Sequence, residues 1–394
     1  MTSHVIHVSF SQSGGTGSVA KILSDQQNVL GMKSQLVTVI ETNLRESPLS
    51  SLRHTLSAGV DEYAIRRQKF SAPISLFRDG FSVPPDPLIK SAKVVHLHGI
   101  NGALSLPQLA KSWPEKRIVW TLHDMNPFTG TCHYSLDCRK FTSDCSGCPA
   151  VKIPFRGMVA NSLASKKAAV SVFDDLRLVA PSAWLAQQAA ASTVFSDHNI
   201  SVIPNPIADD YFSRPTKGTP ARADTGLRVV IVAKNLLDPV KNVAMAVKTF
   251  LSLFPDEAGA NPELVLVGQG GEGFVSHRVK ALGALTSEEI IAELDDADVL
   301  VVPSLAENAP LVIAEAAARG VKPLVANIGG MPEMVRMLGQ GNTFDSASGL
   351  SALLELEMST SVEARRGRRV KIQEKASSHF SPQAAANNYA KIYS

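Results

Sequence analysis

Two glutamates in the second half of the chain, Glu307 and Glu315, have the residue type and spacing that would bind a nucleotide. They flank the start of a predicted helix, which follows an apolar run ending at Val302. A carboxylate at this place can accept hydrogen bonds from both hydroxyls of a ribose. The alternative is a solvated helix with two exposed glutamates, but the apolar residues around Glu315 argue against its exposure.

The start of the same helix would suit a diphosphate. Asn308 is predicted to cap the helix, Pro310 to lie at its start and Gly320 to end it. The first backbone amides of a helix have no partner within the helix and carry partial positive charge. We therefore expect Asn308, Leu311 and Val312 to take part in binding the diphosphate.

Two lysines, Lys234 and Lys241, follow a predicted strand over residues 228–233. Ligands of open parallel sheets bind at the carboxyl ends of the strands. A departing nucleoside diphosphate needs cations to take up its developing charge, so a catalytic role fits both lysines. The alternative is a pair of solvated surface lysines, and the spacing alone favours it.

Two segments of the first half also follow predicted strands. The turn that contains Gly14, Gly15 and Gly17 precedes an apparent helix, and its glycines would let the backbone approach a phosphate or a sugar. A tight turn without a ligand is equally compatible with these glycines. His123 and Asp124 end another strand, where a histidine can donate to a sugar hydroxyl or transfer a proton. A satisfied structural histidine is the alternative.

All four cysteines of the chain lie within one short segment, at Cys132, Cys138, Cys145 and Cys148. The closing pair has two residues between its members, a spacing that is ordinary for tetrahedral zinc. We expect a structural zinc site, with disulfides or free thiols as alternatives. His133 could replace one thiolate. A closed site of this kind has no open position, so it is given no catalytic role.

Short apolar runs rich in β-branched residues alternate with helix-like segments along the whole chain. This alternation is typical of parallel sheets covered by helices on both faces, and its two sets predict an α/β protein with two doubly wound, Rossmann-like domains. Prolines between residues 204 and 220 mark the boundary, so the expected parts are 1–205, 206–380 and a last helix in 381–394. The predicted strands cover residues 4–10, 35–40, 94–98, 118–122, 176–180, 201–203, 228–233, 263–267, 299–302 and 323–326.

Composition narrows the class of protein. The chain has 394 residues, of which 44% are hydrophobic and 19% charged, with a net charge of +3. This mild balance does not favour a nucleic-acid binder. No apolar run is long enough to span a membrane, and the first ten residues do not resemble a signal peptide. We therefore expect a cytoplasmic protein.

Two runs of basic residues could form contacts or solvated surfaces. The run that begins at Arg66 and Arg67 continues through Lys69 to apolar residues at 74, 76 and 77, and it could contact an anionic membrane that carries a lipid-linked acceptor. A solvated basic segment is the blander alternative. The arginines at 365, 366, 368 and 369 are expected to form a solvated helix face.

Taken together, these segments resemble the retaining glycosyltransferases of the GT-B fold, in the large family 4 of sucrose synthase-like and mannosyltransferase-like enzymes. The resemblance covers nearly the whole chain. Its most specific part is the glutamate pair with the downstream Gly329-Gly330-Met-Pro332-Glu333. The segment from Thr121 through the four cysteines is similar to a branch that acts on bacterial surface polysaccharides.

The resemblance implies a role for each residue. Lys234 and Lys241 would hold the donor diphosphate, although the family often has arginine at the position of Lys234. Glu307 would contact the transferred sugar and Glu315 the ribose. Gly14 and Gly15 would approach the donor phosphates or the acceptor, and His123 would contact the sugar. The 1–205 domain would face the acceptor, the 206–380 domain would bind the nucleotide sugar across a central cleft, and the last helix would cross back to the first domain.

The implied reaction is transfer of a sugar from a nucleoside diphosphate sugar to a hydroxyl of a glycan or lipid-linked glycan, with retention of configuration. No catalytic metal is expected, because lysines and a helix start would stabilise the leaving group. An inverting enzyme would need a base such as His123 or Asp124. The alternatives are an epimerase or a phosphorylase on the same fold, or a non-catalytic subunit that binds nucleotide sugar or glycan.

Overall fold

The computed structural model describes residues 4–39, 56, 59–66, 72–76, 87–100, 104–213, 226–255 and 262–394. By its internal contacts the chain divides into two compact units, one of Met1–Pro206 with Pro382–Ser394 and the other of Ile207–Ser381. Each unit is built on one parallel sheet. Among the described residues, no helix combines the length and the apolar character needed to cross a bilayer.

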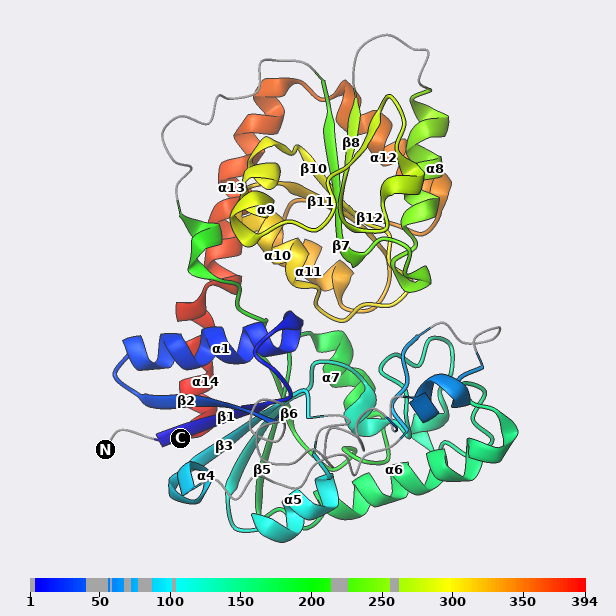
Figure 1. The fold of residues 1–394 in the computed structure, drawn as a ribbon. Helices are drawn as coiled ribbons and strands as arrows, with labels where there is room; N and C mark the ends of the chain where they lie inside the picture. Colours follow the sequence, from blue (N-terminus) through cyan, green and yellow to red (C-terminus); the bar gives the residue numbers. More distant parts are fainter. Residues whose placement is uncertain are drawn as a thin grey trace. The chain divides into compact units, whose positions relative to one another are not determined.

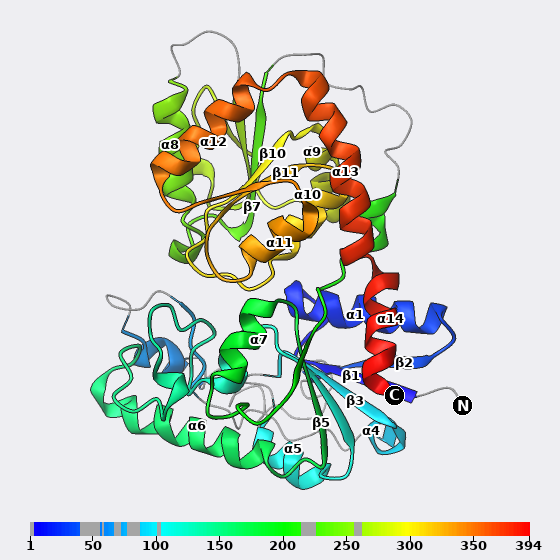
Figure 2. The ribbon, with the colours of Figure 1, turned by 180° about the vertical axis from the view of Figure 1, so that it is seen from behind.

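The first unit has a six-stranded sheet in the order β2-β1-β3-β4-β5-β6 (Figure 1). Helices α1 and α14 lie on one face of this sheet, and α5 and α6 lie on the other (Figure 2). The strands are β1 (His4–Ser9), β2 (Lys33–Thr38), β3 (Val94–His98), β4 (Arg117–Thr121), β5 (Asp175–Ala180) and β6 (Ile200–Val202). The helices are α1 (Gly14–Val29), α4 (Pro87–Ser91), α5 (Leu106–Ser112), α6 (Arg156–Val170), α7 (Ala183–Ala190) and α14 (Pro382–Tyr393).

The second unit repeats the plan with the order β12-β11-β10-β7-β8-β9. Helices α8 and α12 cover one face, and α9, α10 and α13 cover the other (Figure 1). The strands are β7 (Arg228–Asn235), β8 (Glu263–Gln269), β9 (Val279–Ala281), β10 (Val299–Val302), β11 (Lys322–Ala326) and β12 (Asn342–Phe344). The helices are α8 (Val243–Leu253), α9 (Ser287–Asp296), α10 (Leu311–Ala318), α11 (Met331–Leu338), α12 (Ala347–Ser359) and α13 (Val362–Phe380).

The strand predictions are confirmed within two residues at each described end. Strands such as β3, β10 and β11 are buried along their whole length, because helices cover both faces of the sheet. Their largely apolar sequences made these strands predictable. The sequence prediction missed β9 and β12, which are edge strands of three residues each with exposed or half-buried positions.

The expectation of a solvated arginine face on α13 is wrong for three of its four residues. Arg365 is 7% exposed, and the guanidinium of Arg368 pairs with buried Glu357. Arg369 donates to the carbonyl oxygens of Ala297 at 2.6 Å and Arg319 at 2.9 Å. These arginines connect α13 to the rest of its unit through an ion pair and hydrogen bonds. They are therefore structural residues and do not form a solvated face.

Candidate active site

The loop between β10 and α10 holds Glu307 close to a helix start. Helix α10 begins at Leu311 with Pro310 as its N-cap, so the prediction that Asn308 caps the helix is wrong. Proline fits this cap position because a helix start does not need the N–H group that proline lacks. Its extended backbone leads directly into the first turn. Leu311 and Val312 therefore supply the first amides of the helix, and these have no acceptor within it. Gly320, at φ +78, follows the last turn as predicted.

Two hydrogen bonds join this loop to the loop that follows β7. Leu305 donates its backbone N–H to the carbonyl of Val240 at 2.7 Å. The side-chain amide of Asn242, a residue in the left-handed region at φ 52, donates to the carbonyl of Pro303 at 3.3 Å. These contacts place the end of β7 beside the end of β10, as expected for the carboxyl edge of a parallel sheet.

Lys241 and Glu307 meet at this edge. The ammonium of Lys241 donates to Oε1 of Glu307, and their side chains are 33% and 9% exposed. Lys234 is exposed near the end of β7. Of the two predicted lysines, Lys241 thus forms an ion pair with Glu307, the predicted sugar-contacting residue. Lys234, seven residues earlier, lies on the surface.

Glycines shape both sides of this edge. A Cβ atom on Gly268 would lie 1.7 Å from the carbonyl oxygen of Ala233, the residue before Lys234, so only glycine allows β8 to pass this close. Gly330 donates its N–H to the carbonyl of Glu307 at 3.4 Å. The Gly-Gly segment after β11 therefore supports the backbone of Glu307 directly.

Glu315 lies in α10 and is half-buried. Burial raises the pKa of its carboxyl group to about 7. Its charge is also felt by buried Tyr211, because burial first and the negative charge of Glu315 second raise the pKa of the Tyr211 phenol. The alternative of a solvated glutamate does not hold. A desolvated carboxyl group near a helix start has the features of a ligand-binding acid.

In the first unit, the glycine turn leads into α1 with Gly14 as the first helical residue and Ser13 as its N-cap. Gly14 has φ +77, and a Cβ atom added there would meet open space. Gly14 and Gly15 are both exposed. A Cβ atom on buried Gly17 would lie 2.3 Å from the carbonyl oxygen of Ser11, so this glycine closes the turn and the first two remain accessible.

His123 follows the end of β4 and is half-buried. Burial lowers the pKa of its imidazole to about 4. Neighbouring Asp124 accepts from Nδ1 of His133 at 2.6 Å and from the backbone N–H of Asn126 at 2.8 Å. Burial would raise the pKa of Asp124, but these hydrogen bonds and the charge of His133 lower it on balance.

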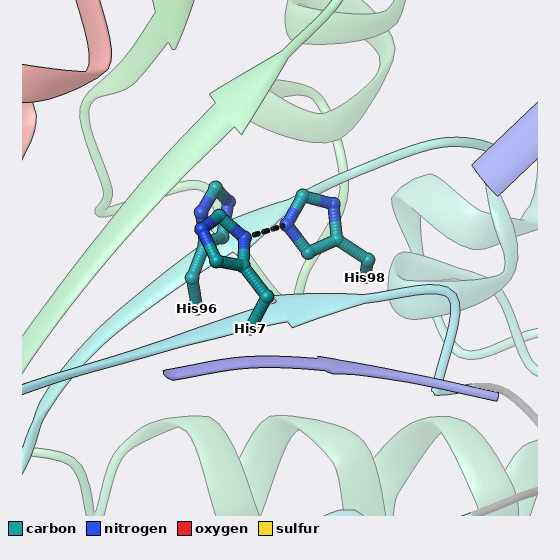
Figure 3. A group of neighbouring side chains, drawn as sticks. All are labelled: His7, His96 and His98. Carbon is teal, nitrogen blue, oxygen red and sulfur yellow. Dashed lines mark hydrogen bonds between the residues drawn. The ribbon is translucent and has the colours of Figure 1, made fainter. Parts of the chain in front are cut away.

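Three further histidines, which sequence reasoning missed, lie beneath His123. His7, His96 and His98 are 0% exposed, and their rings gather on one face of the sheet (Figure 3). Nδ1 of His98 is 3.1 Å from Nε2 of His123. Polar residues two apart in an otherwise apolar strand, at 96 and 98, were the available signal.

The four cysteines line one small pocket in the loop between β4 and α6, and none of them forms a disulfide. Cys132, Cys145 and Cys148 are buried. Cys132 hydrogen-bonds to Cys148, which lowers the pKa of the Cys148 thiol to about 6. Burial raises the pKa of Cys145 to about 11, against a hydrogen bond from the backbone of Gly130.

Other contacts of this loop settle two expectations. Both ring nitrogens of His133 are engaged, Nδ1 with Asp124 and Nε2 with the Ser75 hydroxyl at 2.8 Å, so His133 does not replace a thiolate in this structure. Ile74 and Leu76, the apolar residues of the run that could contact a membrane, are buried, and Ile74 pairs with Cys132. The basic residues of that run at 67, 69 and 78 lie outside the described residues.

Comparison with known proteins shows what the segment that carries this site is similar to. Residues 220–356 match the family Glycosyl transferases group 1. The D-inositol 3-phosphate glycosyltransferase of Nocardia farcinica is 30% identical over 202 residues, 45% of each chain. The putative colanic acid biosynthesis glycosyl transferase WcaC of Escherichia coli is 26% identical over 229 residues, 54% of this chain and 52% of that protein. The matched segment thus spans about half the length of these curated relatives.

Solved structures agree in fold. Anabaena Alr3699/HepE in complex with UDP has a TM-score of 0.62 at 15% identity, with 100% of this chain and 99% of that chain covered. The catalytic domain of starch synthase IV from Arabidopsis thaliana, bound to ADP and acarbose, has the same score, identity and coverage. Residues 220–356 are thus similar to the group 1 family, and the fold is that of the GT-B glycosyltransferases, as the resemblance predicted.

Proposed function

We propose that the protein transfers a sugar from a nucleoside diphosphate sugar to a hydroxyl group, with retention of anomeric configuration. The observation that carries the proposal is the contact between Lys241 and Glu307 beside the first amides of α10, in the unit that contains the matched domain. This places a cation, a carboxylate and a helix start at one edge of a parallel sheet. These are the groups that a nucleotide sugar requires.

In this proposal the residues of the second unit divide the donor among them. Glu315 accepts hydrogen bonds from the ribose hydroxyls, and the amides of Leu311 and Val312 bind the diphosphate, with Asn308 beside them. Lys241 and Lys234 stabilise the charge that develops on the leaving phosphate. Glu307 contacts the transferred sugar, and its pairing with Lys241 holds both side chains in position before the donor arrives.

The first unit supplies the remaining groups. His123 contacts the transferred sugar, and the exposed backbone of Gly14 and Gly15 approaches the phosphates or the acceptor. For retention, the departing phosphate oxygen takes the proton of the acceptor hydroxyl on the face from which it leaves. No protein base is needed for this step, which fits an Asp124 carboxylate whose oxygens are already hydrogen-bonded to His133 and Asn126.

The acceptor proposed is a glycan or a lipid-linked glycan, in the cytoplasm. The matched relative with colanic acid biosynthesis in its name supports this class. A lipid-linked acceptor would bring the protein to the inner membrane surface.

We also propose that the four thiols hold a structural zinc ion. They line one pocket, and backbone N–H groups point at two of the sulfurs, from Gly130 to Cys145 and from Ala150 to Cys148. Such hydrogen bonds stabilise thiolates, the form that binds zinc. Bound zinc would fix the loop after His123 without taking part in the reaction.

Slow hydrolysis of the donor tests the reaction without knowledge of the acceptor, because water replaces the hydroxyl. The protein would be incubated with α-linked nucleotide sugars of uridine, guanosine and adenosine, and the freed sugar followed by proton NMR before it mutarotates. We expect the α-anomer first. The β-anomer would contradict retention, an epimerised nucleotide sugar or phosphate-dependent cleavage would favour the alternative enzymes, and no consumption of any donor would favour a binding subunit.

A further inference from the structure

The buried histidines of the first unit stand in a row that leads to His123. Parallel pairing of β1 with β3 sets His7 opposite His96. Side chains two residues apart in a strand point to the same face, so His98 joins them (Figure 3). His123 lies two residues beyond Thr121, which is paired with His98 across β3 and β4.

Hydrogen bonds join three of these histidines to Gln27 of α1. Oε1 of Gln27 is 2.9 Å from Nε2 of His7. Nδ1 of His7 is 3.0 Å from Nε2 of His98, and Nδ1 of His98 is 3.1 Å from Nε2 of His123. The result is a continuous chain of four side chains, three of them fully buried, that ends at the proposed sugar-contacting residue.

The direction of the chain follows from its first member. The amide oxygen of Gln27 can only accept, so His7 must carry its proton on Nε2. Neutral His7 then accepts at Nδ1 from Nε2–H of His98, and neutral His98 accepts at Nδ1 from Nε2–H of His123. The amide group of Gln27 is held in this orientation because its nitrogen donates to the Tyr393 hydroxyl at 2.9 Å.

The three imidazoles of this chain are neutral at physiological pH, as its hydrogen bonds require. Burial lowers the pKa of His7 to about 4, although the hydrogen bond that His7 donates to Gln27 raises it. Burial also lowers the pKa of His98 well below its usual value and that of His123 to about 4. Each ring therefore holds one proton, and each hydrogen bond has one donor.

We propose that Gln27, His7 and His98 are positioning residues that hold the proton of His123 on Nε2, so that Nδ1 meets the transferred sugar as a hydrogen-bond acceptor. The inference rests on the proposed function, because it assigns the chemistry of the contact that His123 makes. A sugar hydroxyl would donate to His123. The residue would recognise an O–H group and would not supply positive charge to the reaction.

A metal ion is the competing explanation for His7, His96 and His98, since one nitrogen from each lies within 4.8 Å of the others. All six ring nitrogens already have a partner among the described side chains. Those of His96 are Tyr393 at 2.8 Å and Thr121 at 2.7 Å. The rings of His96 and His98 have centroids 3.9 Å apart and planes tilted by 39°, so the two rings lie against each other. Ligands of one ion instead turn ring edges toward a common point.

The direct test is NMR of the full chain with ¹⁵N-labelled histidine. The imidazole shifts give the protonated nitrogen of each ring, and couplings across N–H···N hydrogen bonds give its partner. His123 would be assigned by the loss of its signals in His123→Gln. We expect a neutral His123 with its proton on Nε2, coupled to Nδ1 of His98, and Nε2–H of His98 coupled to Nδ1 of His7. A proton on Nδ1 of His123, or a cationic ring at pH 7, would overturn the proposal.

Two tyrosines of α14 provide a matched pair of conservative variants. Tyr393→Phe removes the hydroxyl that holds the Gln27 amide, so the amide can turn and the Nδ1–H form of His123 should appear in a mixture. Tyr389→Phe removes an equally buried hydroxyl, bonded to Thr121 at 2.8 Å and outside the chain from Gln27 to His123. It should keep the single Nε2–H form. An unchanged His123 in Tyr393→Phe would show that Gln27 does not set the proton.

Two further measurements separate the outcomes. Metal bound to the Cys148→Ser variant and lost after His7→Phe would identify a histidine metal site and overturn the chain. In a transfer assay, Tyr393→Phe should lower kcat several-fold more than Tyr389→Phe, with KM little changed. If the NMR result is as expected but no sugar transfer is observed, the proposed function is contradicted and the proton assignment stands. If transfer is observed with the proton on Nδ1 of His123, only this inference is contradicted.

Discussion

A Cβ atom on Gly329 would lie 1.8 Å from the carbonyl oxygen of Glu307. Gly329 also has φ +61, a conformation that side chains rarely adopt. The backbone of the Gly-Gly segment after β11 therefore packs directly against the backbone of the loop after β10. The position of Glu307 depends on a residue 22 places further along the chain.

Substitution of Gly329 by alanine should displace Glu307. Gly339→Ala is the matched control, because Gly339 has φ +62 but open space where its Cβ would go. The control should lose about 1–2 kcal/mol of unfolding free energy, which is the cost of holding alanine in a left-handed backbone conformation. Gly329→Ala should lose more stability and also lower transfer at least tenfold. Denaturant unfolding and a transfer assay measure both, and equal behaviour of the two variants would contradict the proposed support of Glu307.

Lys241 and Glu307 should act as a coupled pair. We expect Lys241→Ala to lower kcat by roughly 10²-fold, as loss of a group that stabilises developing charge does. Exposed Lys248 on α8 is the control, and Lys248→Ala should leave kcat unchanged. Glu307→Gln should also lower kcat, and the double variant should lose less than the product of the single losses. Independent effects in this double-mutant cycle would argue against the pair as a unit.

The raised pKa of Glu315 predicts how the stability of the folded protein depends on pH. Its pKa of about 7 is raised above the value of 4.5 for an ordinary glutamate. Between these values the folded protein holds a proton that the unfolded chain has released, so the contribution of Glu315 to stability falls as pH rises through this window. Since Glu315 is only half-buried, the effect should be on the order of 2 kcal/mol. In Glu315→Gln this part of the pH dependence should vanish.

Binding of the ribose hydroxyls to a Glu315 carboxylate should expel this proton. The affinity for a nucleotide sugar should therefore rise with pH up to about 7 and then level off. Calorimetry in buffers of different ionisation enthalpy measures the released proton directly, and a nucleotide sugar has no phosphate group that titrates in this range. The same affinity at pH 6 and pH 8 in the unaltered protein would contradict the ribose role.

The cysteine pocket should contain one zinc ion per chain. Cys148→Ser should lose it and lower the thermal midpoint of the first unit, because the energy of binding a structural zinc ion contributes to folding. Ser146→Ala, in the same turn but without a thiol, is the control. Metal analysis and thiol counting measure the outcome. Four freely reactive thiols in metal-free, fully stable protein would contradict the zinc site.

The sequence predicted the parts of this molecule that depend on local pattern. Buried parallel strands are rich in apolar residues, and short runs of such residues mark ten of the strands. The pairing of Lys241 with Glu307 could not be predicted in the same way, because it depends on a backbone contact between Val240 and Leu305. The histidine row likewise requires the register of β1 against β3, which brings His7 to His96 across 89 positions.

The central claim is that the second unit binds a nucleoside diphosphate sugar through Glu315 and the start of α10. The most direct measurement is thermal stability with UDP, GDP and ADP, with Glu315→Ala as the paired variant. A nucleotide at about 100 times its dissociation constant stabilises a native protein by about 2.7 kcal/mol. We predict that one of the three nucleotides stabilises the protein and that Glu315→Ala loses this effect. Equal stabilisation of the variant, or none of the protein by any of the three, would contradict the account.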